Sequence, residues 1–179
     1  RPARQSRRLQ APLAGPGREA LPERVWFWGY ALSMLVAAVL APVLGALADA
    51  RACKRRFLLW STLVCVAGTA LLALVGRGDV WAGLILFGVA NVAFDLGFLF
   101  CSAFLVEITT PDRLGRISGY GWALGYAGGL LSLALAYPFI SGGFAEDNLA
   151  SYRASFTVTA AFFLLASLPT LLWLQERAV

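Results

Sequence analysis

The stretch "GALADARACKRRF", Gly45 to Phe57, separates two apolar segments. The run before it stops at Asp49, and four cations follow between Arg51 and Arg56. The segment that resumes, "FLLWSTLVCVAGTALLALVG", is as apolar as the one that precedes the interruption. Charges confined to the junction between two long apolar runs are typical of a polytopic membrane protein, whose loops carry the charges that its spans exclude.

The composition of the whole chain agrees with this interpretation. Of the 179 residues, 59% are hydrophobic and only 14% are charged, whereas soluble domains carry about 25% charged residues. The net charge of +5 would favour nucleic-acid binding in a soluble protein, but loop charges that orient membrane helices explain it here. We therefore expect a lipid bilayer as the environment and no nucleic-acid partner.

Five apolar runs reach the length of about 20 residues that a membrane-spanning helix needs. They cover about residues 26–48, 57–76, 80–106, 117–139 and 154–174. The alternation typical of barrel strands is absent, and helices satisfy their own backbone hydrogen bonds in lipid. The sequence predicts an all-α, polytopic membrane helix bundle with about five transmembrane helices.

Cations distribute unevenly between the two ends of this bundle. One end carries seven of them: Arg51, Lys54, Arg55, Arg56, Arg113, Arg116 and Arg177. The loops at the opposite end carry Arg77 and Arg153. The positive-inside rule thus places the Gly45–Phe57 junction in the cytosol.

The first 24 residues, "RPARQSRRLQAPLAGPGREALPER", disagree with that orientation. Their six arginines fall on the non-cytosolic side, and counting them gives eight cations against seven. The segment is rich in Pro, Gly and Arg, and the chain does not begin with Met. We expect residues 1–24 to be a disordered basic linker or a non-native start, with a further helix upstream.

The junction resembles the signature loop between the second and third helices of the major facilitator superfamily. In the pattern Gly-x-Leu-Ala-Asp-Arg-x-Gly-Arg-Arg, the residues Gly45, Leu47, Ala48 and Asp49 match in place, and Ala52 stands where the pattern has Gly. The resemblance implies a gate whose charge pairs hold one conformation closed and break in the other. Its expected members are Gly45, Asp49, Arg51, Lys54, Arg55 and Arg56. The alternative is an ordinary positive-inside loop that contains an Asp.

A second stretch narrows the resemblance. "GRISGYGWALGYAGG", Gly115–Gly129, is similar to the junction between the fourth and fifth helices in the vacuolar amino-acid effluxer branch, the autophagy-related permeases and their bacterial relatives. Together the matches cover Trp28–Gly129. On this resemblance the chain is a fragment that covers about the second to sixth helices, and the first helix and the C-terminal half, or a partner half, are missing.

Five glycines of this second stretch are candidates for helix packing or a hinge: Gly119, Gly121, Gly125, Gly128 and Gly129. Gly121, Gly125 and Gly129 stand four residues apart and stack on one helical face, with Gly128 beside them. A face of this kind lets another helix approach closely. Such a helix can serve as a hinge in alternating access, and static small-residue packing explains the pattern equally well.

Asp95 is the most informative single residue, because it lies in the middle of an apolar run. A charge there costs about 2.5–3.5 kcal/mol on insertion scales. Asn91, Asp95 and Ser102, which we call the polar stripe, fall within about 40° of one another on a helix. We expect them to line a solute path in which Asp95 binds a proton or an amine. The alternative is a protonated Asp95 that hydrogen-bonds a neighbouring helix.

Enzyme chemistry has little support. The chain has no His, and its three cysteines, Cys53, Cys65 and Cys101, fit no metal-site or disulfide spacing. We expect no enzyme activity, no metal and no cofactor.

The resemblance favours part of a secondary active transporter for small polar solutes, with amino acids as one candidate class and a proton as a candidate coupled ion. The alternative is a membrane helix bundle that does not transport and has an assembly or interaction role. The multi-pass protein would reside in the inner membrane of a bacterium or the vacuolar membrane of a eukaryote.

Overall fold

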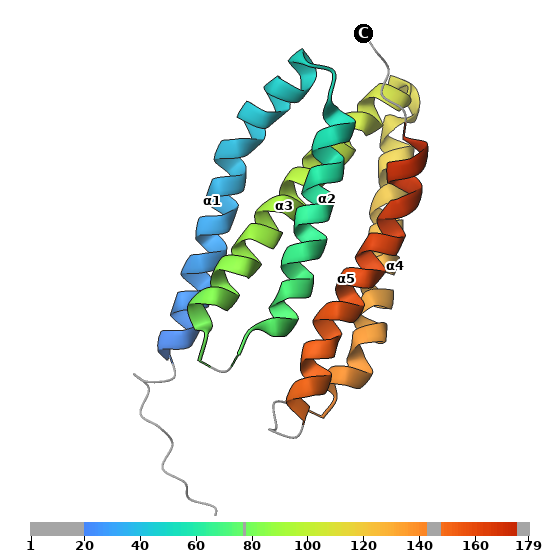
Figure 1. Ribbon diagram of the computed structural model, residues 1–179. Coiled ribbons are helices and arrows are strands. Elements are labelled where there is room, and N and C mark those ends of the chain that lie inside the picture. Colours follow the sequence, from blue (N-terminus) through green and yellow to red (C-terminus); the bar gives the residue numbers. More distant parts are fainter. Residues whose placement is uncertain (1–19, 77, 143–147, 175–179) are drawn as a thin grey trace, which may run out of the picture.

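The computed structural model describes residues 20–76, 78–142 and 148–174. These residues form α1 (Ala20–Ala50), α2 (Lys54–Leu71), a short 3-10 helix η1 (Leu72–Leu74), α3 (Val80–Ile108), α4 (Pro111–Ile140) and α5 (Leu149–Trp173) (Figure 1). No strand occurs in these ranges, and the five α-helices are long and apolar enough to cross a membrane. The prediction of an all-α bundle with five spanning helices is confirmed.

Several helices extend beyond the apolar runs. Helix α1 begins at Ala20, ahead of the apolar run that starts at Trp26, and α4 begins at Pro111, ahead of Ile117. Hydropathy identifies only the part of a helix that lies in the hydrocarbon core of the membrane. The helical hydrogen bonds of the backbone continue through charged turns outside that core. Pro111 suits the first turn of α4, because the missing N–H has no helical partner there. Residues 1–19 of the expected linker lie outside the described residues, while residues 20–24 are helical.

The helices pack as an antiparallel bundle around a central pair, α2 and α3. Helix α3 packs against α2 and α1, and α5 packs against α2 and α4 (Figure 1). Helices α1 and α2 contact each other little although they are consecutive. Helix α4 lies at the periphery, with α5 as its main neighbour. Its surface is therefore largely open.

A tight turn joins η1 to α3 and makes the central pair antiparallel. Gly78 has a φ of +89°, in the left-handed region that glycine adopts without steric cost. The neighbouring Arg77 lies outside the described residues. The guanidinium of Arg153, on α5, donates to the carbonyl oxygen of Val75 over 2.7 Å and fastens this turn to α5.

Gly68 sets how closely α2 approaches α3. A Cβ added at this buried glycine would lie 3.0 Å from the Cβ of Ala90 and 3.4 Å from the carbonyl oxygen of Leu86. The two backbones therefore meet at a point with no room for a side chain. Close approach through small residues is a common way for membrane helices to gain packing energy.

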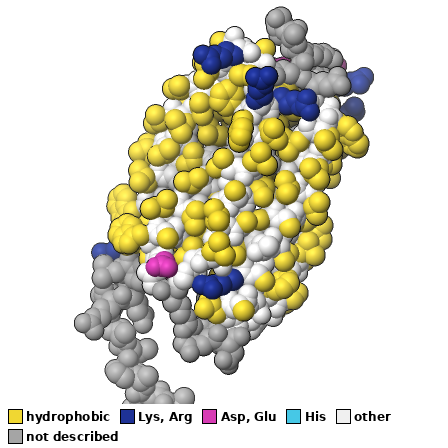
Figure 2. Space-filling model, viewed as in Figure 1, with side chains coloured by type: hydrophobic (Ala, Val, Ile, Leu, Met, Phe, Trp, Pro, Cys, Tyr) yellow, Lys and Arg dark blue, Asp and Glu magenta, His cyan; other side chains and the backbone are white. Residues whose placement is uncertain are grey.

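The best-buried cluster lies at one end of the bundle, where four helices converge. It consists of Ala48, Leu58, Phe100, Phe104 and Leu171. The ring of Phe57 stacks on Phe100 with centroids 5.3 Å apart and extends the cluster. Elsewhere the sides of the bundle expose large apolar side chains, as the space-filling view shows (Figure 2). A surface of this kind is suited to lipid rather than to water.

We predict that Gly68→Leu destabilises the bundle by about 1–3 kcal/mol, because the new side chain must push α2 away from α3. The measurement is the thermal midpoint of the purified protein in detergent. Gly115→Leu is the matched control, since a Cβ there meets no atom of the described residues within 4 Å. Equal midpoints for the two variants would contradict the packing role of Gly68.

Candidate functional site

Two groups of polar residues stand out against the apolar bundle, and the first lies at its cationic end. The ammonium group of Lys54 pairs with Asp49 Oδ1 at 2.6 Å and also forms an ion pair with Glu107. Lys54 begins α2, while Asp49 and Glu107 lie near the C-terminal ends of α1 and α3. The Lys54 side chain is 16% exposed, that of Glu107 26%, and that of Asp49 65%. One lysine thus joins the ends of three helices.

Arg55 extends this network to a fourth helix. Its Nη2 donates to the carbonyl oxygen of Leu171 over 3.0 Å. Leu171 lies in the last turn of α5, where backbone carbonyls have no partner within the helix. We call the set formed by Asp49, Lys54, Arg55 and Glu107, with the Leu171 carbonyl, the edge cluster.

The electrostatics of the edge cluster explain why these residue types occur together. Cations at the start of α2 and acids near the ends of α1 and α3 are each unfavourable next to their own helix dipole. Bringing the positive first turn of α2 against the negative ends of α1, α3 and α5 offsets all of these costs. Figure 2 shows that Lys and Arg gather at this end of the molecule.

The expected gate residues do not all take part in this network. Asp49, Lys54 and Arg55 come together, whereas the guanidinium groups of Arg51 and Arg56 form no ion pair with the residues that the structure describes. A Cβ added at Gly45 would likewise meet none of these residues within 4 Å. Most of the expected loop belongs to helices α1 and α2, and only residues 51–53 lie between them.

Sequence reasoning did not single out Glu107. Its position in the last turn of α3 could have indicated this role. In an antiparallel bundle the end of α3 lies at the same end of the molecule as the end of α1 and the start of α2. Ala52 is a second feature of this junction. Its φ of +45° lies in the left-handed region, which favours the glycine that the family pattern has at this place.

The second polar group lies within the span of α3. Asn91 Nδ2 donates to Ser33 Oγ of α1 over 3.1 Å and to Asp95 Oδ2 over 3.4 Å. Ser33 is 4% exposed, and its hydroxyl donates to the Tyr30 carbonyl oxygen over 2.7 Å. The amide of Asn91 therefore holds the Asp95 carboxylate and fixes α3 against α1.

The polar stripe faces the side of α3 that lies between α1 and α4. Asn91 contacts α1 through Ser33, and Phe98, two turns further along the same face, contacts Trp122 of α4 with ring centroids 5.7 Å apart. Asp95 is half-buried between these contacts, and Ser102 is exposed one turn beyond Phe98. The structure thus joins Asn91 to Asp95, while Ser102 shares their face without contacting them.

The glycines of α4 make no close approach within the bundle. A Cβ added at any of the five would meet no described residue within 4 Å. The five are Gly119, Gly121, Gly125, Gly128 and Gly129. Their side of α4 is open, as are Trp122 and Tyr126 beside them.

Most remaining hydroxyl groups in the spans bond to their own helix, which is the common arrangement for Ser and Thr in membrane helices. Ser61 and Thr62 donate to the Leu58 carbonyl oxygen, and Thr69 donates to that of Cys65. Across residues 20–76, 78–142 and 148–174, no three His, Cys, Asp or Glu side chains are grouped so as to hold a metal ion.

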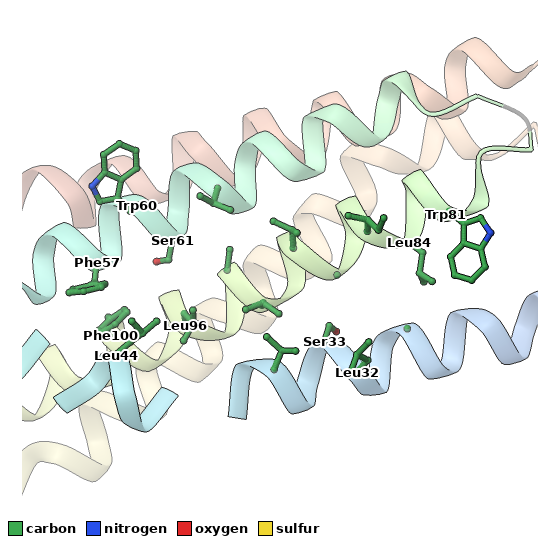
Figure 3. A pocket seen from close by; sticks show the side chains of 18 residues that line it. Leu32, Ser33, Leu44, Phe57, Trp60, Ser61, Trp81, Leu84, Leu96 and Phe100 are labelled. Carbon is green, nitrogen blue, oxygen red and sulfur yellow. The ribbon is translucent and has the colours of Figure 1, made fainter. Parts of the chain in front are cut away.

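A large apolar cavity of about 700 Å³ opens between α1 and α2, over α3. Figure 3 shows its lining side chains, which come from all three helices. Asn91 and Asp95 are not among them. Ser33, which accepts a hydrogen bond from Asn91, does line the cavity, so the cavity and the polar stripe adjoin each other at Ser33.

We predict that Lys54→Gln lowers the free energy of unfolding by about 1.5–3 kcal/mol, the contribution of hydrogen bonds to charged groups. The loss leaves the Glu107 carboxylate half-buried and unpaired. Thermal unfolding in detergent measures the effect, with Arg113→Gln, an exposed cation at the same end, as the control. The double variant Lys54→Gln/Glu107→Gln should recover part of the loss, and a single variant as stable as the control would contradict this role of Lys54.

Comparison with known proteins shows what the chain is similar to. Residues 25–113 match the model of a family described as "Vacuole effluxer Atg22 like". Over 158 residues the chain is 33% identical to the uncharacterized MFS-type transporter YxiO of Bacillus subtilis (strain 168). That alignment covers 84% of this chain and 37% of the relative, so the chain spans well under half of the relative's length.

No solved structure matches the chain. The family model covers α1, α2 and α3, which carry the edge cluster and the polar stripe, and the relative extends the match over most of the chain. The chain is thus a multi-pass membrane protein that is similar to the Atg22-like vacuole effluxers over residues 25–113 and to an MFS-type transporter over most of its own length.

Proposed function

We propose that the chain is part of a secondary active transporter that moves small polar solutes by alternating access, and that amino acids are the first solute class to test. The observation that carries the proposal is a carboxylate, Asp95, held by Asn91 in the middle of a spanning helix. Charges at such depth mark solute and ion paths in membrane proteins. The similarity to an effluxer family and to an MFS-type transporter supports the same conclusion.

Asp95 has the chemistry to bind a cation in this path. One oxygen accepts from Asn91, which leaves capacity on the carboxylate for a proton or for the ammonium group of an amino acid. Ser102, exposed on the same face, supplies a hydroxyl for polar groups of the solute. A proton at Asp95 is our candidate for the coupled ion.

The edge cluster is our candidate for a gate. Lys54 has two acidic partners, and the more exposed of them, Asp49, can exchange Lys54 for a charge on another part of a longer transporter. Arg51 and Arg56, both exposed, are the further cations of the same gate. Breaking pairs of this kind in one conformation and forming them in the other is a known switching device.

The open face of α4 suits a contact with further helices. Its five glycines meet nothing in the described bundle, and the MFS-type relative is much longer than the aligned region. We infer that the rest of a full-length transporter, including a first helix and a second half, or a partner half, packs here and at Gly45. In this contact α4 would act as a hinge.

The membrane in which the protein resides depends on the kind of organism. It would be the inner membrane of a bacterium or the vacuolar membrane of a eukaryote. A bundle with only an assembly role is the less favoured alternative, because both comparisons point to transporters. An enzyme is disfavoured for the same reason.

We predict that Asp95→Asn lowers transport at least tenfold, because the amide keeps the shape but removes the charge. The measurement is efflux of a labelled amino-acid mixture from cells or vesicles that contain the complete transporter, at several values of pH. Asp112→Asn, at an exposed position in the first turn of α4, is the matched control and should transport normally. Normal, pH-dependent efflux by Asp95→Asn would contradict the assignment.

A further inference from the structure

We propose that the bundle binds an anionic phospholipid beside the first turn of α2. The phosphate lies against Arg51 and Arg56, and an acyl chain occupies the apolar cavity between α1 and α2. The site includes none of the three residues of the polar stripe, although Ser33, the partner of Asn91, lines the apolar cavity. The inference does not depend on which solute is transported.

The headgroup end is a cavity of about 430 Å³ at the edge of the bundle. It is lined by Arg51, Cys53, Arg56, Phe57 and Trp60. The two arginines are exposed, and their guanidinium groups form no ion pair or side-chain hydrogen bond with the described residues. The two other cations of the junction, Lys54 and Arg55, are already engaged. Two guanidinium groups are therefore left for an external anion.

The charge balance and the aromatic residue both fit a phosphate at a membrane surface. Four cations of the junction face two acids, Asp49 and Glu107, so a net positive charge remains after the internal pairs are formed. Guanidinium groups bind phosphate through paired hydrogen bonds. Trp60 is 65% exposed beside them, and tryptophan favours the level of the lipid headgroups.

The headgroup cavity adjoins the apolar one. Phe57 and Trp60 line both, and Figure 3 shows them at one end of the apolar cavity with Phe100 nearby. Along α1 the lining extends from Leu44 to Gly29, which is about 22 Å at 1.5 Å per residue. One leaflet contributes about 15 Å of the hydrocarbon core. The cavity is therefore long enough for an acyl chain that begins at the arginines.

The walls of the apolar cavity suit hydrocarbon better than a polar solute. Ser33 and Ser61 are its only hydroxyl-bearing lining residues. Ser33 donates to the Tyr30 carbonyl oxygen and Ser61 to that of Leu58. Neither hydroxyl has a proton left to donate, and apart from the indole N–H groups of Trp60 and Trp81 the remaining lining side chains are apolar.

Native mass spectrometry tests the site, using purified protein with equal amounts of phosphatidylglycerol and phosphatidylcholine. We expect preferential retention of phosphatidylglycerol. Arg51→Gln/Arg56→Gln should weaken it about 30-fold, from the contribution of two arginines at a membrane surface. The control Arg113→Gln/Arg116→Gln removes two exposed arginines of α4 at the same end and should change nothing. Equal retention of both lipids, or an equal loss in the control, overturns the proposal.

A second pair of variants tests the acyl chain. Val64 lines the apolar cavity and its neighbour Leu63 does not, although the two are about equally exposed. Val64→Trp should fill the cavity and abolish the preference for phosphatidylglycerol, whereas Leu63→Trp should keep it. Unchanged retention in Val64→Trp, or competition by soluble glycerol phosphate as strong as that by the lipid, overturns a lipid site.

Discussion

The positions of α1, α3 and α5 at the cationic end of the bundle depend on the first turn of α2. Lys54 pairs with acids at the ends of α1 and α3, and Arg55 bonds the end of α5. Directly beneath these polar contacts, Leu58, Phe100 and Leu171 form the best-buried apolar cluster. The charged groups and the apolar cluster support one another, because burial strengthens the ion pairs and the ion pairs hold the helices over the cluster.

The opposite end of α2 is held differently. Arg153 fastens the turn before α3 to α5 through a backbone carbonyl, and Gly68 brings α2 against α3. Helix α3 thereby presents one face to α2 and its polar stripe to the side between α1 and α4. Helix α1 is attached to that stripe by the Ser33–Asn91 hydrogen bond. Because Asn91 also donates to Asp95, a movement of α1 relative to α3 would shift the amide that holds the Asp95 carboxylate.

Hydropathy and charge alone predict the number and approximate limits of the helices, since only apolar runs of this length can cross a bilayer. They also predict that Asp49 and Lys54 lie close to each other, because both belong to one short junction. The partner acid Glu107 lies 53 residues from Lys54, so only the three-dimensional packing reveals it. Ser33 is a similar case, because a serine in a span usually bonds its own helix, and its contact with Asn91 depends on how α1 and α3 are rotated.

Accessibility of the polar stripe to water tests the central claim most directly. In a protein whose Cys53, Cys65 and Cys101 are replaced by Ala, Ser102→Cys should react with a membrane-impermeant maleimide. Leu165→Cys is the comparison, because Leu165 is 65% exposed on α5 and faces outward from an apolar helix. Labelling of Ser102→Cys with protection of Leu165→Cys is the predicted result. Equal protection of both would mean that the stripe faces lipid or protein, and would contradict a solute path along α3.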